Sequence, residues 1–135
     1  MIGVIDASTL IRIFVPDDPF PESADSFFRG VERGENIAIA PELLIVESAN
    51  VVSKKRKQGD LSDEEGEQLL SDLLSMPIRY YPHLPIISNA YDLSKRYDLT
   101  VYDAIYIALS IDQSAVLFTE DQKLREVAIK LHLIA

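Results

Sequence analysis

The chain has no cysteine and no tryptophan, and only two histidines among its 135 residues. Without cysteine it can form neither a disulfide nor a thiolate metal site. The two histidines, His83 and His132, lie far apart in the sequence and have no metal-ligand spacing. We therefore interpret each of them as structural or solvent-exposed, and we look for chemistry elsewhere.

Long hydrophobic runs are also absent. No stretch approaches the roughly eighteen apolar residues that are needed to span a bilayer. The first nine residues contain an acid and no basic leader, which is not typical of a signal peptide. Hydrophobic residues make up 47% and charged residues 26% of the chain, as in ordinary globular proteins. We expect one domain over residues 1–135 and, by default, a cytoplasmic location without membrane contact.

The net charge of −9 argues against nucleic-acid binding, which normally leaves a basic footprint. Bound cations would cancel part of this charge if some of the acids are metal ligands. The basic residues are unevenly spread, with Lys54 and Lys55 opening a basic block over residues 54–57. A solvated helix end, favoured by the helix dipole, explains this block. Contact of Arg12, Lys54 and Lys55 with phosphates is the alternative.

Short β-rich runs alternate with longer helical patterns, which is typical of an α/β fold with a parallel sheet. The expected strands cover residues 1–5, 37–40, 78–81 and 115–118, with a short edge strand at 133–135. The expected helices cover residues 7–14, 22–33, 41–57, 62–75, 85–97, 101–111 and 120–131. The pattern predicts a central, mainly parallel sheet of four to five strands that is flanked by helices.

Several residues mark where these elements begin and end. Pro41 suits the first turn of a helix, and Ser62 with Glu65 forms a capping-box pattern. Gly34 and Gly59 follow helical patterns and should stop them. The helix that starts at residue 7 should be broken by prolines, namely Pro16, Pro19 and Pro21.

Asp6 directly follows the first expected strand, which is apolar and predicted to be buried. Open α/β sheets place their ligand sites beyond the carboxyl ends of the strands. A helix cap is the competing interpretation, with Asp6 or Ser8 accepting from free backbone amides. The residues alone leave both interpretations open.

Glu47 lies in a predicted helix among apolar neighbours, with Leu43, Leu44 and Val51 three or four residues away. This spacing places its carboxylate in the stripe that faces the core. Burial of an unpaired charge costs several kcal/mol, so such acids are usually paired or bound to metal. A distant arginine partner, or a position at the edge of the stripe, would explain Glu47 without a site.

Asp103 and Asp121 also stand where a surface role explains them poorly. Asp103 begins a helix that is apolar almost all round, although Thr100 three residues earlier makes a capping box possible. Asp121 lies just beyond the fourth expected strand, where Thr119 as a cap would be the local explanation. Glu120 is a neighbouring rival, and the sequence does not rank the two acids.

If the sheet brings these acids together, they must repel one another. Two carboxylates at about 5 Å repel by about 3 kcal/mol at an effective dielectric of about 20. Such a cluster has to be protonated or has to hold cations. A site made only of carboxylate oxygens suits Mg²⁺ or Mn²⁺ better than zinc.

The ordered acidic motifs resemble those of the PIN domain family, and most closely its VapC-type toxins of VapBC toxin–antitoxin pairs. The motifs are residues 4–8 (VIDAS), 45–49 (IVESA), 102–104 (YDA) and 119–121 (TED). The resemblance implies a three-layer fold and a Mg²⁺- or Mn²⁺-dependent endoribonuclease. It also implies a homodimer and an antitoxin partner that covers the acidic groove.

The resemblance further assigns roles to residues. It implies that Asp6, Glu47, Asp103 and Asp121 are the catalytic and metal-binding quartet. Ser8 and Thr119 match the small polar residues that often support such a quartet. Glu120, which neighbours Asp121, could share its load.

On this basis the mechanistic hypothesis is hydrolysis of an RNA phosphodiester by water that a metal ion activates. Asp6 and Asp103 would hold the main ion, with Asp121 and Glu47 completing its ligands directly or through water. A second ion could arrive with the substrate and stabilise the leaving oxygen. Glu47 is alternatively a group that orients or deprotonates the water. The products would carry a 5′-phosphate and a 3′-hydroxyl.

Other interpretations fit less well or remain open. A phosphoacceptor regulatory module would need an acidic pair next to Asp6, which is missing. An inactive scaffold of the same fold, which binds RNA or a protein without cutting, is not excluded. Base stacking by the tyrosines is conceivable, although core packing explains most of them better. The set comprises Tyr80, Tyr81, Tyr102 and Tyr106.

Overall fold

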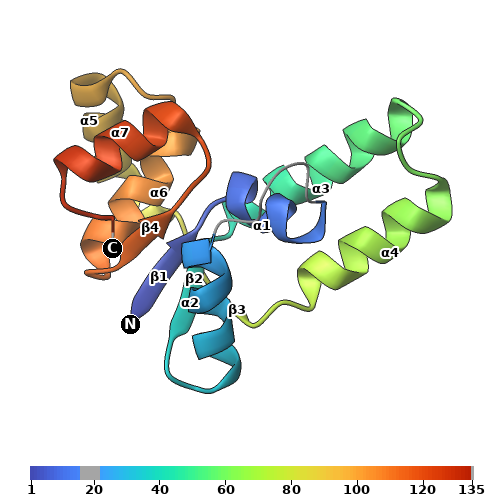
Figure 1. Ribbon diagram of the computed structural model, residues 1–135. Coiled ribbons are helices and arrows are strands. Elements are labelled where there is room, and N and C mark those ends of the chain that lie inside the picture. Colours follow the sequence, from blue (N-terminus) through green and yellow to red (C-terminus); the bar gives the residue numbers. More distant parts are fainter. Residues whose placement is uncertain (16–21, 135) are drawn as a thin grey trace.

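The computed structural model describes residues 1–15 and 22–134 (Figure 1). The first part of the chain contains β1 (Ile2–Ile5), α1 (Ala7–Phe14), α2 (Glu22–Glu32), β2 (Ile37–Pro41), α3 (Leu43–Lys57) and α4 (Asp63–Leu74). The second part contains β3 (Ile78–Tyr81), the 3₁₀ turn η1 (Leu84–Ile86), α5 (Ile87–Tyr97), α6 (Val101–Asp112), β4 (Val116–Phe118) and α7 (Gln122–Lys130).

The described strands form one parallel sheet in the order β3-β2-β1-β4. Val4 in the middle of β1 lies opposite Ile39 of β2 and Leu117 of β4. Because all strands run in the same direction, their carboxyl ends meet at one edge. The predicted α/β class with a central parallel sheet is confirmed.

Alternate strand residues enter two hydrophobic clusters, one on each face of the sheet. Val4 and Leu117 belong to the cluster that α5, α6 and α7 cover. Ile5 and Phe118, the next residues of the same strands, belong to the cluster under α1, α2, α3 and α4. The result is three layers, with α3 and α4 extending away from the sheet as a helical hairpin (Figure 1).

Gly3 allows the second cluster to close over β1. The rings of Phe27 and Phe118 pack with their centroids 4.6 Å apart. A Cβ on Gly3 would lie 2.7 Å from an atom of each ring, which is closer than van der Waals contact allows. Glycine is therefore needed here for the close approach of two aromatic rings to the backbone.

Most local signals act as the sequence predicts. Ser62 and Glu65 form the full capping box of α4, and Thr100 accepts a hydrogen bond from the amide of Asp103 to cap α6. Gly34 and Gly59 follow α2 and α3 with φ angles of +76° and +82°. That left-handed conformation is natural for glycine and ends each helix.

Four predictions about the positions of the elements are wrong. Pro41 does not open a helix but is the last residue of β2, opposite Tyr81. The helix expected from residue 85 begins instead as η1, and α5 follows from Ile87. The last helix starts at Gln122 rather than at residue 120, because Asp121 is its N-cap.

The expected edge strand at 133–135 is the fourth. Leu133 and Ile134 lie in no strand, and the contact to the sheet is a hydrogen bond from the Leu117 amide to the Leu133 carbonyl at 2.7 Å. Residue 135 and the predicted breaks at Pro16, Pro19 and Pro21 lie outside the described residues. Within the described part of the chain, no helix is long and apolar enough to cross a membrane.

Candidate active site

Asp6 lies at the carboxyl end of β1 and is 4% exposed. Its Oδ1 accepts hydrogen bonds from the Ser8 hydroxyl at 2.7 Å and from the Thr9 amide at 3.0 Å. The second of these bonds makes Asp6 the N-cap of α1. Its Oδ2 accepts from the Thr119 hydroxyl, which comes from the end of β4. Asp6 therefore caps a helix and also faces a neighbouring strand end.

Burial raises the pKa of Asp6 from 3.8 to about 6, although the hydrogen bonds from Thr119, Thr9 and Ser8 lower it in part. Desolvation disfavours the charged form, while donors that point at a carboxylate favour it. Here desolvation prevails. A cation beside Asp6 would compensate for the lost hydration, which is the usual condition of a buried charge.

Ser8 and Thr119 join the ends of β1 and β4. The Ser8 hydroxyl accepts from the backbone amide of Glu120 at 2.9 Å. The Thr119 hydroxyl accepts from the amide of Asp121 at 3.0 Å while it donates to Asp6. Both side chains thus orient the loop that carries the acids after β4. Their supporting role in catalysis stays a prediction, with which these hydrogen bonds are compatible.

Glu47 is half-buried on the first turns of α3. Its Oε1 accepts a hydrogen bond from the Tyr106 hydroxyl of α6 at 2.5 Å. Burial raises the pKa of Glu47, the bond from Tyr106 lowers it, and the charge of Asp103 raises it again. The partner of Glu47 is therefore a tyrosine on another helix, and not the arginine that the alternative interpretation required.

Asp103 stands half-buried in the first turn of α6. Burial raises its pKa, and the charge of Asp121 raises it further, whereas the charge of Lys123 lowers it. Asp121 is the N-cap of α7, where its Oδ1 accepts from the Leu124 amide at 2.9 Å. The local prediction that Thr119 is this cap is wrong, because Thr119 Oγ1 serves Asp6 and the Asp121 amide instead.

Three of the predicted acids thus influence one another by charge, and Tyr106 senses the fourth, Asp6. Glu47 and Asp103 are coupled, Asp103 and Asp121 are coupled, and Tyr106 senses Glu47, Asp6 and Asp103. None of the ion pairs of the described residues neutralises any of them. Such an excess of negative charge with oxygen donors fits a hard divalent cation.

The structure does not draw the four carboxylates into a ligand cluster. Over residues 1–15 and 22–134, no group of three or more histidine or acidic side chains is already arranged to hold a metal ion. The donor set fits Mg²⁺ or Mn²⁺ in its chemistry. Its side chains would have to close in around the ion.

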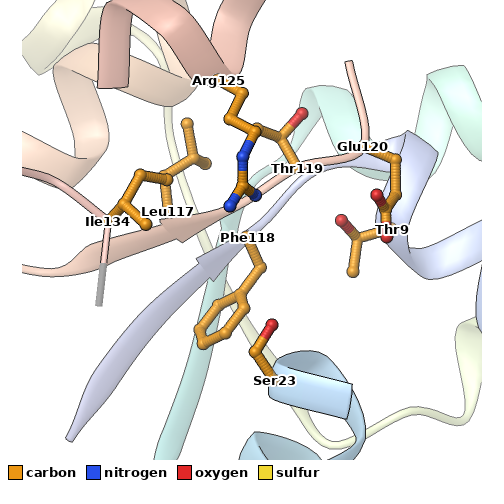
Figure 2. A pocket seen from close by; sticks show the side chains of 8 residues that line it. All are labelled: Thr9, Ser23, Leu117, Phe118, Thr119, Glu120, Arg125 and Ile134. Atoms are coloured by element: carbon orange, nitrogen blue, oxygen red, sulfur yellow. The ribbon is translucent and has the colours of Figure 1, made fainter. Parts of the chain in front are cut away.

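Glu120 takes a different direction from Asp121. It lines a cavity of about 290 Å³ together with Thr9, Ser23 and Arg125 (Figure 2). The charge that raises the pKa of Asp103 comes from Asp121. The geometry therefore favours Asp121 over Glu120 as the member of the acidic group.

The predicted phosphate-binding residues lie at helix ends. Lys54 and Lys55 are in the last turn of α3 and Arg12 is in the last turn of α1. Lys54 follows Glu47 by seven residues, which places it on the same helix face about 10 Å further along. Its position therefore agrees with the favourable helix-dipole end and is also compatible with a substrate contact.

His83 has the structural role that the sequence suggested. Its Nε2 accepts the backbone amide of Leu43 at 2.9 Å, at the start of a helix whose N-cap residue Glu42 makes no side-chain cap. An imidazole from a neighbouring segment thus satisfies an amide that the helix leaves free.

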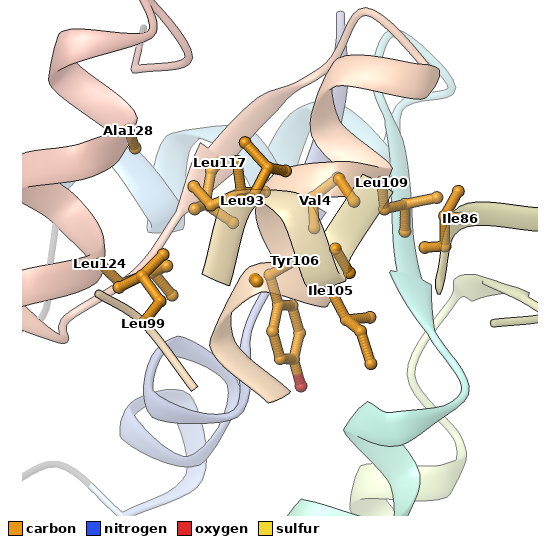
Figure 3. Close-up of a cluster of buried hydrophobic side chains, with 14 of the residues drawn as sticks. Val4, Ile86, Leu93, Leu99, Ile105, Tyr106, Leu109, Leu117, Leu124 and Ala128 are labelled. Carbon is orange, nitrogen blue, oxygen red and sulfur yellow. The ribbon is translucent and has the colours of Figure 1, made fainter. Parts of the chain in front are cut away.

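Sequence reasoning missed two residues of the site. Tyr106 is 2% exposed, with its ring inside the first hydrophobic cluster and its hydroxyl directed out of it (Figure 3). Burial and then the bond to Glu47 raise its pKa, so it stays a neutral donor. Its place three residues after Asp103, on the same helix face, was the available signal. Lys123 had no such signal in the sequence, because it lies on α7 and lowers the pKa of Asp103 on α6 only through the tertiary structure.

Known proteins resemble this chain over most of its length. The PIN domain family matches residues 3–130. Ribonuclease VapC3 of Pyrobaculum aerophilum is 27% identical over 125 residues, which are 91% of this chain and 92% of that protein. Ribonuclease VapC1 of Mycobacterium tuberculosis is 31% identical over 90 residues, 67% of each chain.

Solved structures share the fold. PAE2754 from Pyrobaculum aerophilum aligns with a TM-score of 0.68 at 20% identity, over 96% of this chain and 88% of that one. VapBC2 from Rickettsia felis, bound to a DNA fragment from their promoter, aligns with a TM-score of 0.68 at 16% identity, over 93% and 92%. With the family match over most of its length and these relatives, the chain belongs to the PIN domain family, among its VapC-type members.

Proposed function

We propose that this protein is a divalent-metal-dependent endoribonuclease that hydrolyses RNA phosphodiester bonds as the toxin of a toxin–antitoxin pair. The observation that carries the proposal is the electrostatic coupling of Glu47, Asp103 and Asp121 beside the buried Asp6. Carboxylates that raise one another's pKa and have no basic partner are unfavourable without a cation. The relatives named ribonuclease supply the reaction class.

Asp6, Asp103, Asp121 and Glu47 are the proposed ligands of Mg²⁺ or Mn²⁺. When bound, the ion would lower the pKa of a water molecule and stabilise negative charge on the phosphoryl oxygens. Asp6 is held in place by Ser8 and Thr119. Glu47, whose Oε1 is occupied by Tyr106, keeps its other oxygen free to orient or accept a proton from the attacking water. No side chain needs to act as a nucleophile.

Substrate binding would begin on the basic helix ends. Lys54 and Lys55 lie in the last turn of α3, the helix that carries Glu47. We propose that both contact phosphates of the RNA, with Arg12 as a third contact. Lys123 is a further candidate, because its ion pair with Asp98 at 3.5 Å is exposed and easily exchanged for a phosphate.

Two solved relatives support the proposal of an antitoxin partner. VapBC2 from Rickettsia felis and a toxin–antitoxin complex from Klebsiella pneumoniae align over 93% and 90% of this chain. We propose a cognate antitoxin that covers the acidic groove, and a homodimer as the assembled form. An RNA substrate and such an antitoxin would both be met in the cytoplasm, where we propose that the protein acts.

A fluorogenic RNA assay tests the function. We expect cleavage with Mn²⁺, none with EDTA, and a loss of cleavage in Asp6→Asn. Asp112→Asn is the matched control, because this acid is exposed at the end of α6, away from the quartet. Cleavage that survives EDTA or Asp6→Asn would reject the site. RNA binding without cleavage in Mn²⁺ would favour an inactive scaffold of the same fold.

A further inference from the structure

Tyr106 differs from the buried Phe27 and Phe118 because it carries a hydroxyl, and this hydroxyl points out of the core. Its ring is 2% exposed and packs in the cluster under α5, α6 and α7. Figure 3 shows the hydroxyl pointing out of that cluster. At 2.5 Å from Glu47 Oε1, it makes the side-chain bond between α6 and α3, 59 residues apart.

This bond is the one hydrogen bond to the Glu47 side chain within the described residues. Glu47 has a long side chain whose torsions are free to rotate, and holding it in one orientation costs conformational entropy. Tyr106 is rigid because its ring is packed on all sides. A rigid donor that binds one carboxylate oxygen leaves the second oxygen with a fixed direction.

We propose that Tyr106 is a positioning residue that fixes the Glu47 carboxylate for metal binding. The inference rests on the proposed function for the identity of the metal site. Partners that orient ligands in this way typically contribute 10- to 100-fold to metal affinity or activity. Tyr106→Phe removes the hydroxyl alone and preserves the packing of the ring.

Titration calorimetry with Mn²⁺, in the absence of RNA, tests the proposal. We expect Tyr106→Phe to weaken Mn²⁺ binding about 10- to 100-fold. In a Glu47→Gln background the same change should add nothing, because its target carboxylate is gone. Tyr80→Phe is the matched control, since Tyr80 is a half-buried tyrosine whose hydroxyl makes no hydrogen bond within the described residues.

A merely structural role predicts other results. Unchanged Mn²⁺ affinity in a folded Tyr106→Phe protein, or an equal loss with and without Glu47, would overturn the proposal. If Tyr106→Phe fails to fold by circular dichroism, Glu47→Asp replaces it, because a shorter acid retracts from Tyr106 while it keeps its charge. A Glu47→Asp protein with full Mn²⁺ affinity would also overturn it. All readouts use the free protein, so they stand even if no RNA is cut.

A second inference comes from the exposure of Tyr102, which the core interpretation of the tyrosines did not predict. It is 63% exposed, directly before Asp103 and four residues before Tyr106 on α6. Residues four apart share a helix face. Tyr102 therefore lies on the face of α6 that carries Tyr106, one residue before Asp103, and is exposed to solvent.

We infer that Tyr102 is a stacking platform for an unpaired RNA base beside the carboxylates. The inference rests on the proposed RNA substrate. Aromatic side chains bind single strands by stacking on bases, which every base permits and a duplex prevents.

Fluorescence anisotropy of a labelled single-stranded RNA tests this inference in the Asp6→Asn background, in which we expect the RNA to remain uncut during the measurement. We expect Tyr102→Ala to weaken binding about 5- to 100-fold, and Tyr102→Phe to leave it unchanged. Tyr91→Ala is the matched control: it is 57% exposed on α5, with the Lys95 amine 4.9 Å from its ring centre. The same loss on an abasic strand, or no loss at all, would overturn the inference.

Discussion

The two halves of the candidate site are held in different ways. Around Asp6 the strand ends form a buried network, in which both carboxylate oxygens accept hydrogen bonds from fixed donors. Around Glu47 and Asp103 the helices supply half-exposed carboxylates, and Tyr106 donates a hydrogen bond to Glu47 alone. The first half is therefore preorganised, whereas the second can adjust when an ion and a substrate arrive.

This difference has a chemical meaning. A preorganised carboxylate loses no rotational freedom when it binds an ion, but it carries the full cost of desolvation when it is empty. A half-exposed carboxylate has the opposite properties. The raised pKa of Asp6, to about 6, is the visible sign of the first situation.

The largest expected effect separates the two halves by activity. Asp6→Asn should lower kcat/KM on RNA by roughly 10³-fold, because an activating ion is worth several kcal/mol in the transition state. Glu47→Gln should lower kcat/KM less, because the half of the site around Asp6 stays intact. Kinetics of both variants with Mn²⁺ measure this ranking. An equal or reversed order would show that the strand-end half is not the anchor.

The second prediction concerns stability and pH. Between about pH 4 and pH 6, folded Asp6 keeps a proton that the unfolded chain has lost. Stability should therefore fall as pH rises through this window, by about 3 kcal/mol, and stay lower above it. Asp6→Asn lacks this loss.

Urea unfolding of the parent protein and of Asp6→Asn over pH 4–7.5 checks this prediction. The difference between their unfolding free energies at each pH gives the contribution of Asp6. Mn²⁺ should recover part of the loss above pH 6 by binding the folded chain. Parallel curves for the two proteins would contradict the raised pKa.

The third prediction concerns the link between β1 and β4. Thr119→Val keeps the shape of the side chain but removes the donor to Asp6 and the acceptor of the Asp121 amide. We expect a loss of about 1–3 kcal/mol in unfolding free energy, since buried partners are left unsatisfied. Thr119→Ser keeps the hydroxyl and should lose much less. Equal effects of the two variants would mean that packing alone matters.

The smallest effect belongs to the basic end of α3. Lys54→Ala and Lys55→Ala should weaken RNA binding and each reduce the slope of log affinity against log salt by about 0.7. Lys130→Ala, at the end of α7, is the control. Binding measured at several salt concentrations gives the slopes, and slopes identical to the parent chain would remove these lysines from the substrate path.

The sequence was sufficient wherever a structure depends on neighbours in the chain. The capping box of Ser62 and the cap of Thr100 each need a partner three residues away, and both form as expected. The alternation of apolar strands and helices gave the α/β class. The local rules were less accurate at boundaries, where Pro41 ended a strand and Asp121 replaced Thr119 as a cap.

The sequence also indicated which acids lie at strand ends or on apolar helix faces, but it did not indicate the hydrogen-bond partners of those acids. Asp6 meets Thr119 across 113 residues and Glu47 meets Tyr106 across 59. Those separations in sequence are closed only when parallel strands align their carboxyl ends and when the Tyr106 hydroxyl of α6 reaches Glu47 of α3. Periodicity tells which face of an element is apolar, whereas the tertiary packing decides which polar groups from other elements meet that face.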